Sequence, residues 1–308
     1  MSGIKTIFIV GPTASGKTEL GIRLAKKFGG EIVSADSMQI YGGIHIASAA
    51  PDEEEKRGIR HHMLEFLEPE SEFSVADYTK AARKIIKDIN SRGRLPIVVG
   101  GTGLYINALA DNTVFITEKT DSLLRDRLEK RFDNIGGAAM LKELETVDTV
   151  SAAKLHPNDR KRIVRAFEVY SLTGETKTRQ NELSKTGEKI IDPFFIGITY
   201  RDRQKLYGRI NLRVDKMLEN GLLDEAKAAL NRNGGGAFQA IGHKELAGYI
   251  NGECTLEEAA ERLKMQTRRY AKRQLTWFNK NERIHWLYPD GGGDIFSAAE
   301  DLINNFLA

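Results

Sequence analysis

Short apolar runs alternate with helical segments along most of the chain. The runs occupy residues 7–10, 31–35, 95–99 and 194–198. Continuous apolar runs of this length are typical of strands that are buried on both faces of a parallel sheet. The pattern therefore predicts an α/β fold with a parallel sheet.

Other segments show helical spacing. Residues 74–93 carry apolar side chains at helical spacing, and Ser74-Val75-Ala76-Asp77 forms a capping box at their start. Residues 256–281 predict a second long helix, and residues 284–308 predict a closing strand and an edge helix. Residues 42–73 show weak periodicity, so we expect an irregular connection with short helical pieces there.

The character of the chain changes between residues 112 and 192. Strands that end in glycine disappear there, and charged helical patterns replace them. A buried-strand pattern returns at residues 194–198. We therefore predict a discontinuous core formed by residues 1–111 and 193–308, and a mostly helical insertion formed by residues 112–192.

Composition and charge narrow the class of protein. The 308 residues are 41% apolar and 29% charged, with a formal net charge of +3, as in soluble globular proteins. No stretch approaches the roughly 18 apolar residues of a membrane span, and the first strand begins too early to leave room for a targeting segment. Cys254 is the single cysteine, which excludes an internal disulfide and a thiolate zinc cluster. These features predict a cytoplasmic protein.

The first apolar run leads into a phosphate-binding loop. Its sequence is Gly11-Pro12-Thr13-Ala14-Ser15-Gly16-Lys17-Thr18, which matches G-x-x-x-x-G-K-[ST] between a strand and a helix. The glycines let backbone N–H groups surround a phosphate, and the helix N-terminus adds a partial positive charge. Lys17 can reach the outer phosphate oxygens, and the Thr18 hydroxyl can hold Mg²⁺. The motif predicts binding of a diphosphate or triphosphate, and a turn that binds nothing is the less favoured alternative.

Polar residues follow two further strands. Asp36-Ser37-Met38-Gln39 comes after residues 31–35, and Gly100-Gly101-Thr102-Gly103 comes after residues 95–99. Ligands gather at the carboxyl ends of parallel strands, so we expect Asp36 and Thr102 beside the phosphate loop. The glycines permit a close approach of the backbone to a ligand. A purely structural role of Asp36, as a helix cap or turn residue, stays open.

Two helical segments carry basic faces. Arg160, Lys161, Arg162 and Arg165 lie off the apolar stripe of one predicted helix, and residues 256–281 carry seven cations. Tyr270, Trp277 and Phe278 lie beside the last of these cations, an arrangement that suits RNA phosphates and bases. A solvated surface and the helix dipole are alternative reasons for the same charges.

The phosphate loop alone leaves the chemistry open. No strand after the loop shows the apolar run followed by aspartate that holds magnesium in many ATPases, because two glycines follow Val98-Val99. This argues against ordinary ATP chemistry. Arg203, Arg209 and Arg213 could serve as the lid of a small-molecule kinase, so that reading is the principal alternative.

A set of motifs resembles one family over nearly the whole chain. The motifs GPTASGKT, SADSMQIY, GIRHHM, FSVADY, LPIVVGGTGLY, HPNDRKRIVRAFEVYSLTG, AIGHKE and QTRRYAKRQLTWF occur in the order and spacing of the bacterial tRNA dimethylallyltransferases. The resemblance implies a P-loop NTPase-like core with a helical insertion that grips the anticodon stem-loop, in a monomer. It also implies transfer of a dimethylallyl group from dimethylallyl diphosphate to N6 of adenosine 37 in tRNAs that read codons starting with U.

The resemblance assigns roles to individual residues. It implies that the loop, Lys17, Thr18 with Mg²⁺, and Arg213 stabilise a departing diphosphate, since the bond broken is C–O. Asp36 would accept the proton of N6, and Thr13 and Thr102 would line the passage where the substrates meet. The implied tRNA contacts are Asp36, Ser37, Met38, Gln39 and Thr102, then Arg125 (with Arg127 nearly equivalent), Lys161, Arg162, Ile163, Val164, Arg165, Gly242, His243, Lys244, Gln274, Trp277 and Lys280.

The chain departs from the family pattern at a few positions. Met38 stands where arginine is frequent, and Ala50 stands where the family has a lysine that could contact phosphate. The zinc finger of some eukaryotic members is absent. Two other functions stay open besides the kinase: a nucleotide-gated RNA-binding module without chemistry, and prenylation of free adenine nucleotides as in plant relatives.

Overall fold

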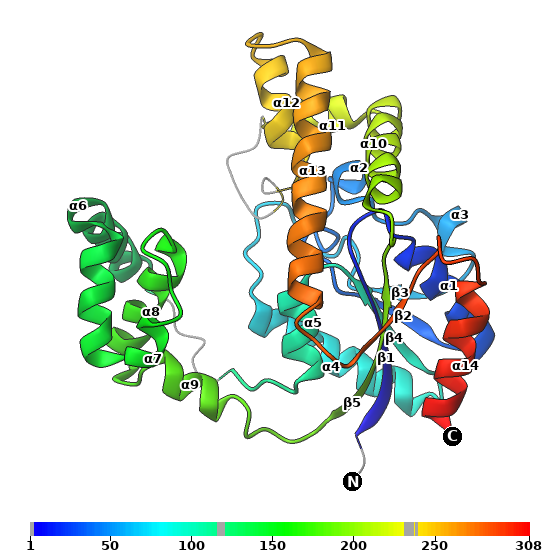
Figure 1. Cartoon of the computed structure of the whole chain (residues 1–308), viewed down its shortest axis with the longest axis horizontal. Coiled ribbons are helices and arrows are strands. Elements are labelled where there is room, and N and C mark those ends of the chain that lie inside the picture. Colours follow the sequence, from blue (N-terminus) through cyan, green and yellow to red (C-terminus); the bar gives the residue numbers. More distant parts are fainter. Residues whose placement is uncertain (1–2, 116–120, 231–236, 238–239) are drawn as a thin grey trace. The chain divides into compact units, whose positions relative to one another are not determined.

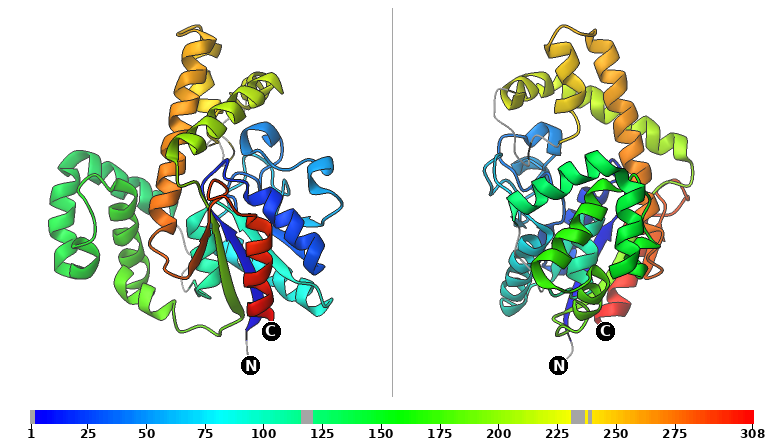
Figure 2. Two further views of the ribbon diagram at one scale, coloured as in Figure 1. Left: turned by 45° about the vertical axis from the view of Figure 1, so that its right-hand side comes forward. Right: turned by 90° about the vertical axis from the view of Figure 1, so that its left-hand side faces the viewer.

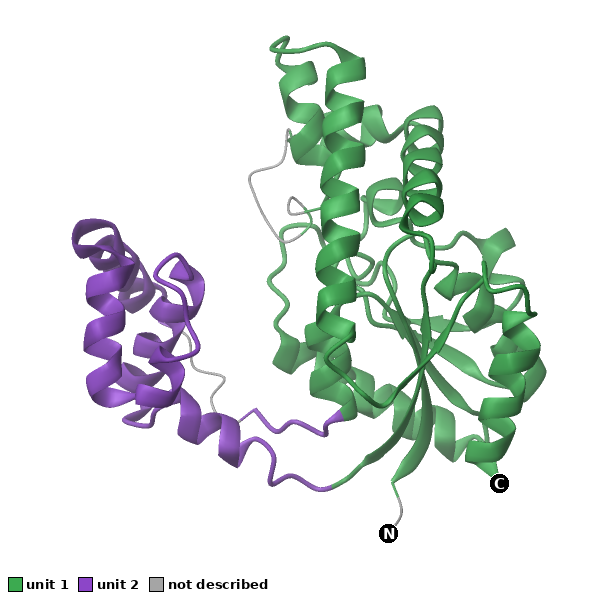
Figure 3. Cartoon of the chain, in the orientation of Figure 1, with its two compact units in different colours: residues 1–110, 189–308 green, residues 111–188 purple. Residues whose placement is uncertain are grey.

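The computed structural model describes residues 3–115, 121–230, 237 and 240–308. The chain divides into two compact units (Figures 1 and 3): unit 1 comprises residues 1–110 and 189–308, and unit 2 comprises residues 111–188. The second boundary lies four residues before the expected one, because the returning strand already pairs with the sheet at Ile191.

Unit 1 is built on a six-stranded sheet whose neighbouring strands all run parallel. The order across the sheet is β3 (His61–His62), β2 (Glu31–Ser34), β4 (Pro96–Gly100), β1 (Ile4–Val10), β5 (Ile191–Ile198) and β6 (Ile284–Leu287). The predicted α/β class is confirmed. Strand β3 was not predicted, because it is two residues long and lies in the weakly periodic connection.

The apolar runs are buried on both faces because successive side chains point to opposite sides of the sheet. Phe8 and Val10 pack on one face against α4 (Val75–Ser91) and α5 (Gly103–Ala110). Ile7 and Ile9 pack on the other face against α1 (Lys17–Phe28) and α14 (Ile295–Leu307). Figure 1 shows these two helical layers on either side of the strands.

Two of the expected helices begin where the sequence predicted, and each begins with a capping box. Ser74 accepts from the Asp77 N–H at 3.2 Å while Asp77 accepts from the Ser74 N–H at 2.9 Å, which forms the capping box of α4. The predicted long basic helix is α13 (Leu256–Phe278), and Thr255 and Glu258 form the same motif at its start.

Four further helices of unit 1 form a separate layer over the carboxyl end of the sheet. They are α10 (Arg203–Glu219), α11 (Leu222–Leu230), α12 (His243–Ile250) and α13. Val214, Leu222, Leu246 and Leu263 form their shared core. Figures 1 and 2 show α13 running from this layer toward α5, where Trp277 contacts Gly103.

Unit 2 consists of helices, as predicted for the insertion. These are α6 (Ser122–Val147), α7 (Thr149–Ala152), α8 (Arg160–Thr173) and α9 (Lys177–Leu183). Helix α6 is broken at Gly136, whose φ of 78° and ψ of 160° are not helical. Its second half buries Met140 and Leu144.

Candidate active site

The phosphate loop has the strained backbone that its glycines predict. Gly11 has a φ of 146°, and a Cβ atom there would lie 2.3 Å from the carbonyl oxygen of Ile198, so only glycine fits beside β5. Gly16 has a φ of 100° and stands at the N-cap of α1. The Lys17 Nζ donates to the Pro12 carbonyl at 2.6 Å, which folds the lysine back along the loop.

The ends of β2 and β4 are joined beside this loop. The Thr102 Oγ1 accepts from the Ser37 N–H at 2.9 Å, and the Thr102 N–H donates to the Ala35 carbonyl at 3.1 Å. A Cβ atom on Gly100 would lie 2.2 Å from the Ala35 carbonyl oxygen. Gly100, the last residue of β4, therefore allows the segment after β2 to approach closely, while Gly100 and Gly101 also line the cavity described below.

Gln274 is a structural bridge inside this region. Its Oε1 accepts from the Thr13 N–H at 2.8 Å, and its Nε2 donates to the Gly101 carbonyl at 3.0 Å. The side chain is buried and its amide joins the phosphate loop to the loop after β4. Gln274 was predicted as a tRNA contact, but the structure uses both polar atoms of its side chain within the protein.

Asp36 and Gln39 begin the segment after β2. The Asp36 Oδ1 accepts from the Met38 N–H at 2.9 Å, so the carboxylate is oriented by a turn while it also lines the cavity described below. The Gln39 Oε1 accepts from Ser34 Oγ at 2.8 Å, and its Nε2 donates to the Ala49 carbonyl at 3.1 Å. Gln39 therefore holds α2 (His45–Ser48) to β2, and its amide is engaged inside the protein.

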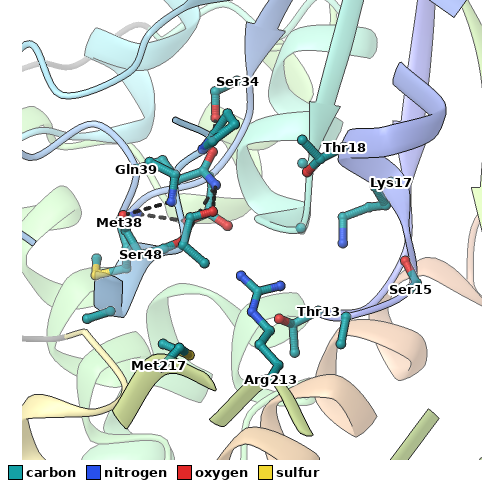
Figure 4. Close-up of a pocket in the computed structure, with 18 of the residues that line it drawn as sticks. Thr13, Ser15, Lys17, Thr18, Ser34, Met38, Gln39, Ser48, Arg213 and Met217 are labelled. Carbon is teal, nitrogen blue, oxygen red and sulfur yellow. Dashed lines mark hydrogen bonds between the residues drawn. The ribbon is translucent and has the colours of Figure 1, made fainter. Parts of the chain in front are cut away.

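A cavity of about 1090 Å³ joins these parts. Its walls comprise residues 13–18 of the loop, residues 36–39, helix α2, and the faces of α10 and α13 that carry Arg213 and Tyr270. Figure 4 shows Lys17 and Arg213 directed into the same space, with Thr13 of the phosphate loop beside Arg213. The structure thus brings together the predicted catalytic residues Thr13, Lys17, Asp36 and Arg213, and Thr102 lies directly behind Ser37.

The charges in the cavity act on one another. Burial and the neighbouring Arg213 lower the pKa of Lys17 to about 7, while the Asp36 carboxylate acts in the opposite direction. Burial also lowers the pKa of Arg213, again opposed by Asp36. Lys17, Arg213 and Asp36 therefore share a partly desolvated space, in which the two basic side chains favour a multiply charged anion.

The residues of the loop fit a bound magnesium ion. Thr18 lines the cavity from the first turn of α1, and the Ser15 Oγ is buried without a hydrogen-bond partner. No cluster of three acidic, histidine or cysteine side chains that could hold a metal occurs among the residues described. Mg²⁺ commonly binds through one or two protein oxygens together with substrate phosphates, which is the donor set available here.

The predicted RNA contacts on α12 and α13 differ in exposure. Gly242 and His243 are buried, and the His243 Nε2 lies 3.1 Å from Glu225 Oε1, so its side chain does not face the surface as we expected. Lys244 is exposed. Trp277 is 38% exposed and borders an open groove of about 230 Å³ with Lys280.

The predicted tRNA contacts in unit 2 also include both buried and exposed residues. Ile163 and Val164 are buried in the unit's core, so their side chains are not available on its surface. Lys161 and Arg162 are exposed on α8. Arg125 and Arg165 both donate to the Oε2 of the buried Glu168, at 2.9 and 2.8 Å.

Tyr270 and Arg209 belong to the site, although the sequence suggested them only as an aromatic suited to RNA and as part of a possible kinase lid. The Arg209 Nε donates to the Ala14 carbonyl at 2.9 Å and so braces the phosphate loop. Burial, and after it Asp36, raise the pKa of the Tyr270 hydroxyl, while the neighbouring Thr102 and Gln274 side chains act in the opposite direction. The spacing of Thr267, Tyr270 and Gln274 along one helical face was the available signal.

Comparisons with known proteins agree with this arrangement. The family model for IPP transferase matches residues 39–281. A tRNA dimethylallyltransferase of Caldanaerobacter subterraneus subsp. tengcongensis is 47% identical over 294 residues, which cover 93% of this chain and 92% of the relative.

Two solved structures are similar over nearly the whole chain. The tRNA isopentenylpyrophosphate transferase of Bacillus halodurans is 40% identical, with a TM-score of 0.71 over 98% of this chain and 95% of that one. A eukaryotic dimethylallyltransferase acting on tRNA is 31% identical, with a TM-score of 0.84 over 99% of this chain and 80% of that one. No helix in the described ranges has the length and apolar character to cross a bilayer. The chain therefore belongs to the IPP transferase family, whose curated relatives are tRNA dimethylallyltransferases.

Proposed function

We propose that this protein transfers the dimethylallyl group of dimethylallyl diphosphate to N6 of adenosine 37 in tRNAs that read codons starting with U. The observation that carries the proposal is that one cavity holds the phosphate loop with Lys17 and Arg213 and, on another wall, the Asp36 carboxylate. An allylic diphosphate offers the anion that the loop binds, and an exocyclic amine needs a base. Family membership supplies the donor and the acceptor class.

The loop side of the cavity would stabilise the leaving group. As the C–O bond breaks, its electron pair leaves with the diphosphate, whose growing charge faces the loop N–H groups, Lys17 and Arg213. Thr18 and the diphosphate oxygens would hold Mg²⁺, which supplies further charge stabilisation when it is bound. Gln274 and Arg209 keep the loop in place by hydrogen bonds to Thr13 and Ala14.

Asp36 would complete the proton balance. The N6 lone pair is delocalised into the purine, so the amine is a weak nucleophile, and it becomes acidic as the N–C bond forms. A carboxylate held beside the reacting atoms accepts that proton, a contribution of about 100- to 10,000-fold. The hydrogen bond from the Met38 N–H fixes one Asp36 oxygen and leaves the second oxygen for the substrate.

The acceptor base must leave the anticodon loop to reach this cavity. Unstacking a base costs a few kcal/mol, and less in a loop than in a duplex. The groove beside Trp277 and Lys280 offers an aromatic ring with cations, and Lys161 and Arg162 offer exposed cations on unit 2. These surfaces suit RNA phosphates and bases.

Isotope-labelled dimethylallyl diphosphate, Mg²⁺ and unmodified tRNA test the proposal directly. Nucleoside mass spectrometry should find one prenylated adenosine, and mapping should place it at position 37. Asp36→Asn keeps an oxygen acceptor for Met38 and should lower turnover by about 100-fold or more while tRNA still binds. Near-normal turnover of this variant would remove Asp36 as the base, and ATP hydrolysis without prenyl transfer would reject the function.

A further inference from the structure

Helix α2 lacks a cap of its own. Ile44 stands at the N-cap and has no side-chain acceptor for the N–H groups of the first turn. Glu225, on α11 and far along the chain, takes this role instead. Its Oε2 accepts from the Ile46 N–H at 2.7 Å, and its Oε1 accepts from the Ala47 N–H at 2.9 Å.

A buried histidine holds this carboxylate from the other side. The His243 Nε2 lies 3.1 Å from Glu225 Oε1, and His243 has no exposed surface. A carboxylate only accepts hydrogen bonds, so the ring nitrogen is the donor. Three donors therefore converge on one carboxylate that is itself only 11% exposed. A charge buried to this degree is stable only because it is paired and hydrogen-bonded.

Helix α2 is consequently fixed at both ends. Glu225 holds its first turn, and Gln39 holds its last turn through the Ala49 carbonyl. The helix forms a wall of the cavity, and Ile46 and Ala47 line that wall. The same two residues pack against the core of the α10–α13 layer. A change at Glu225 would therefore move a wall of the cavity.

We propose that Glu225 and His243 are positioning residues that fix α2 as a wall of the donor cavity and thereby set the shape of the space in which the donor binds. The inference rests on the proposed function, because the cavity is taken to bind dimethylallyl diphosphate. It also replaces the expected role of His243, since a side chain with no exposed surface does not contact tRNA.

Two substitutions of His243 separate positioning from simple packing. His243→Gln keeps an N–H donor that reaches the place of Nε2, whereas His243→Phe keeps a ring of similar size without a donor. Glu225→Ala removes the cap altogether. Each variant is compared with the wild type by thermal melting, tRNA affinity, donor KM and kcat, and by the ratio of kcat/KM for geranyl diphosphate to that for dimethylallyl diphosphate.

We expect His243→Phe and Glu225→Ala to raise the donor KM about tenfold, because the free energy of a charge-assisted hydrogen bond no longer holds α2 in the position that the donor needs. The geranyl ratio should rise with it, while tRNA affinity stays within about twofold and His243→Gln stays near the wild type. A calorimetric titration with dimethylallyl thiodiphosphate makes the same comparison of donor affinity without turnover.

Two results would overturn the inference. One is equal donor KM, donor affinity and geranyl ratio in His243→Gln and His243→Phe. The other is weakened tRNA binding with an unchanged donor KM, which would return His243 to an RNA role. A wild-type protein that transfers no prenyl group would instead reject the proposed function, and the calorimetric comparison would still decide whether Glu225 and His243 shape the cavity.

Discussion

Lys17 is expected to change its charge between the free site and the site with a bound diphosphate. In the free protein it donates to the Pro12 carbonyl, and burial together with Arg213 brings its pKa to about 7. A bound diphosphate would place negative charge beside the ammonium and so raise that pKa. Binding of the proposed donor would therefore change the charge of the cavity.

This coupling predicts proton uptake on binding. Above a pH of about 7 the free Lys17 is largely neutral, so binding of dimethylallyl thiodiphosphate should take up protons, and affinity should fall as the pH rises. Calorimetry in buffers of different ionisation enthalpy measures the uptake. Lys17→Ala should bind more weakly and lose most of this uptake, whereas Lys26→Ala, on the exposed face of α1, should keep it. An uptake unchanged in Lys17→Ala would assign the proton to another group.

At the level of secondary-structure elements, one carboxylate helps to hold strand β3 at its edge of the sheet. Strand β3 has only two residues, and Glu31 at the start of β2 accepts from the His62 Nε2 at 2.8 Å and from the Arg92 Nη2 at 2.9 Å. The hydrogen bond from Arg92 lowers the pKa of Glu31 to about 2, against the effect of burial. The carboxylate thus ties β2 to β3 and to the end of α4.

Acid should weaken the interactions of the Glu31 carboxylate between pH 4.5 and about 2. A carboxyl group whose pKa is lowered on folding stabilises the protein above its unfolded value of 4.5, and this contribution is lost as the pH falls toward 2. Glu31→Gln should therefore lower Tm at neutral pH and show a shallower decline of Tm between these values. Glu19→Gln breaks only an exposed pair with Arg57 and should follow the wild type. Parallel pH profiles of Glu31→Gln and the wild type would contradict this assignment.

Across the whole molecule, the sequence predicted the features that depend on neighbouring residues, and it did not predict the contacts between residues far apart in the chain. The phosphate loop, the Ser74 capping box and the apolar strands depend on neighbouring residues, so the α/β core and the place of Asp36 could be predicted. The bridge from Gln274 to Thr13 and the cap from Glu225 to Ile46 join residues far apart in the chain. No local pattern shows that such side chains are engaged inside the protein, and the family resemblance had placed Gln274 and His243 among the expected RNA contacts.

The exposed cations of unit 2 allow a test of its predicted role. Lys161→Ala with Arg162→Ala should weaken tRNA binding and reduce the slope of log K against log salt by about one to two, because each phosphate contact releases condensed counterions. Lys84→Ala with Lys87→Ala removes the same charge from the exposed face of α4 and serves as the control. Equal losses in both double variants would indicate a general effect of charge.

In the proposed function the phosphate loop serves a reaction at carbon, in which the prenyl C–O bond breaks. Dimethylallyl diphosphate with a heavy-oxygen label in its bridging C–O–P position tests this claim when it is incubated with the protein, Mg²⁺ and unmodified tRNA. Mass spectrometry of the products should find the label in the released diphosphate and an unlabelled prenyl group on tRNA. Labelled dimethylallyl alcohol or monophosphate, with the tRNA unchanged, would show that the loop performs phosphoryl chemistry and would contradict the account.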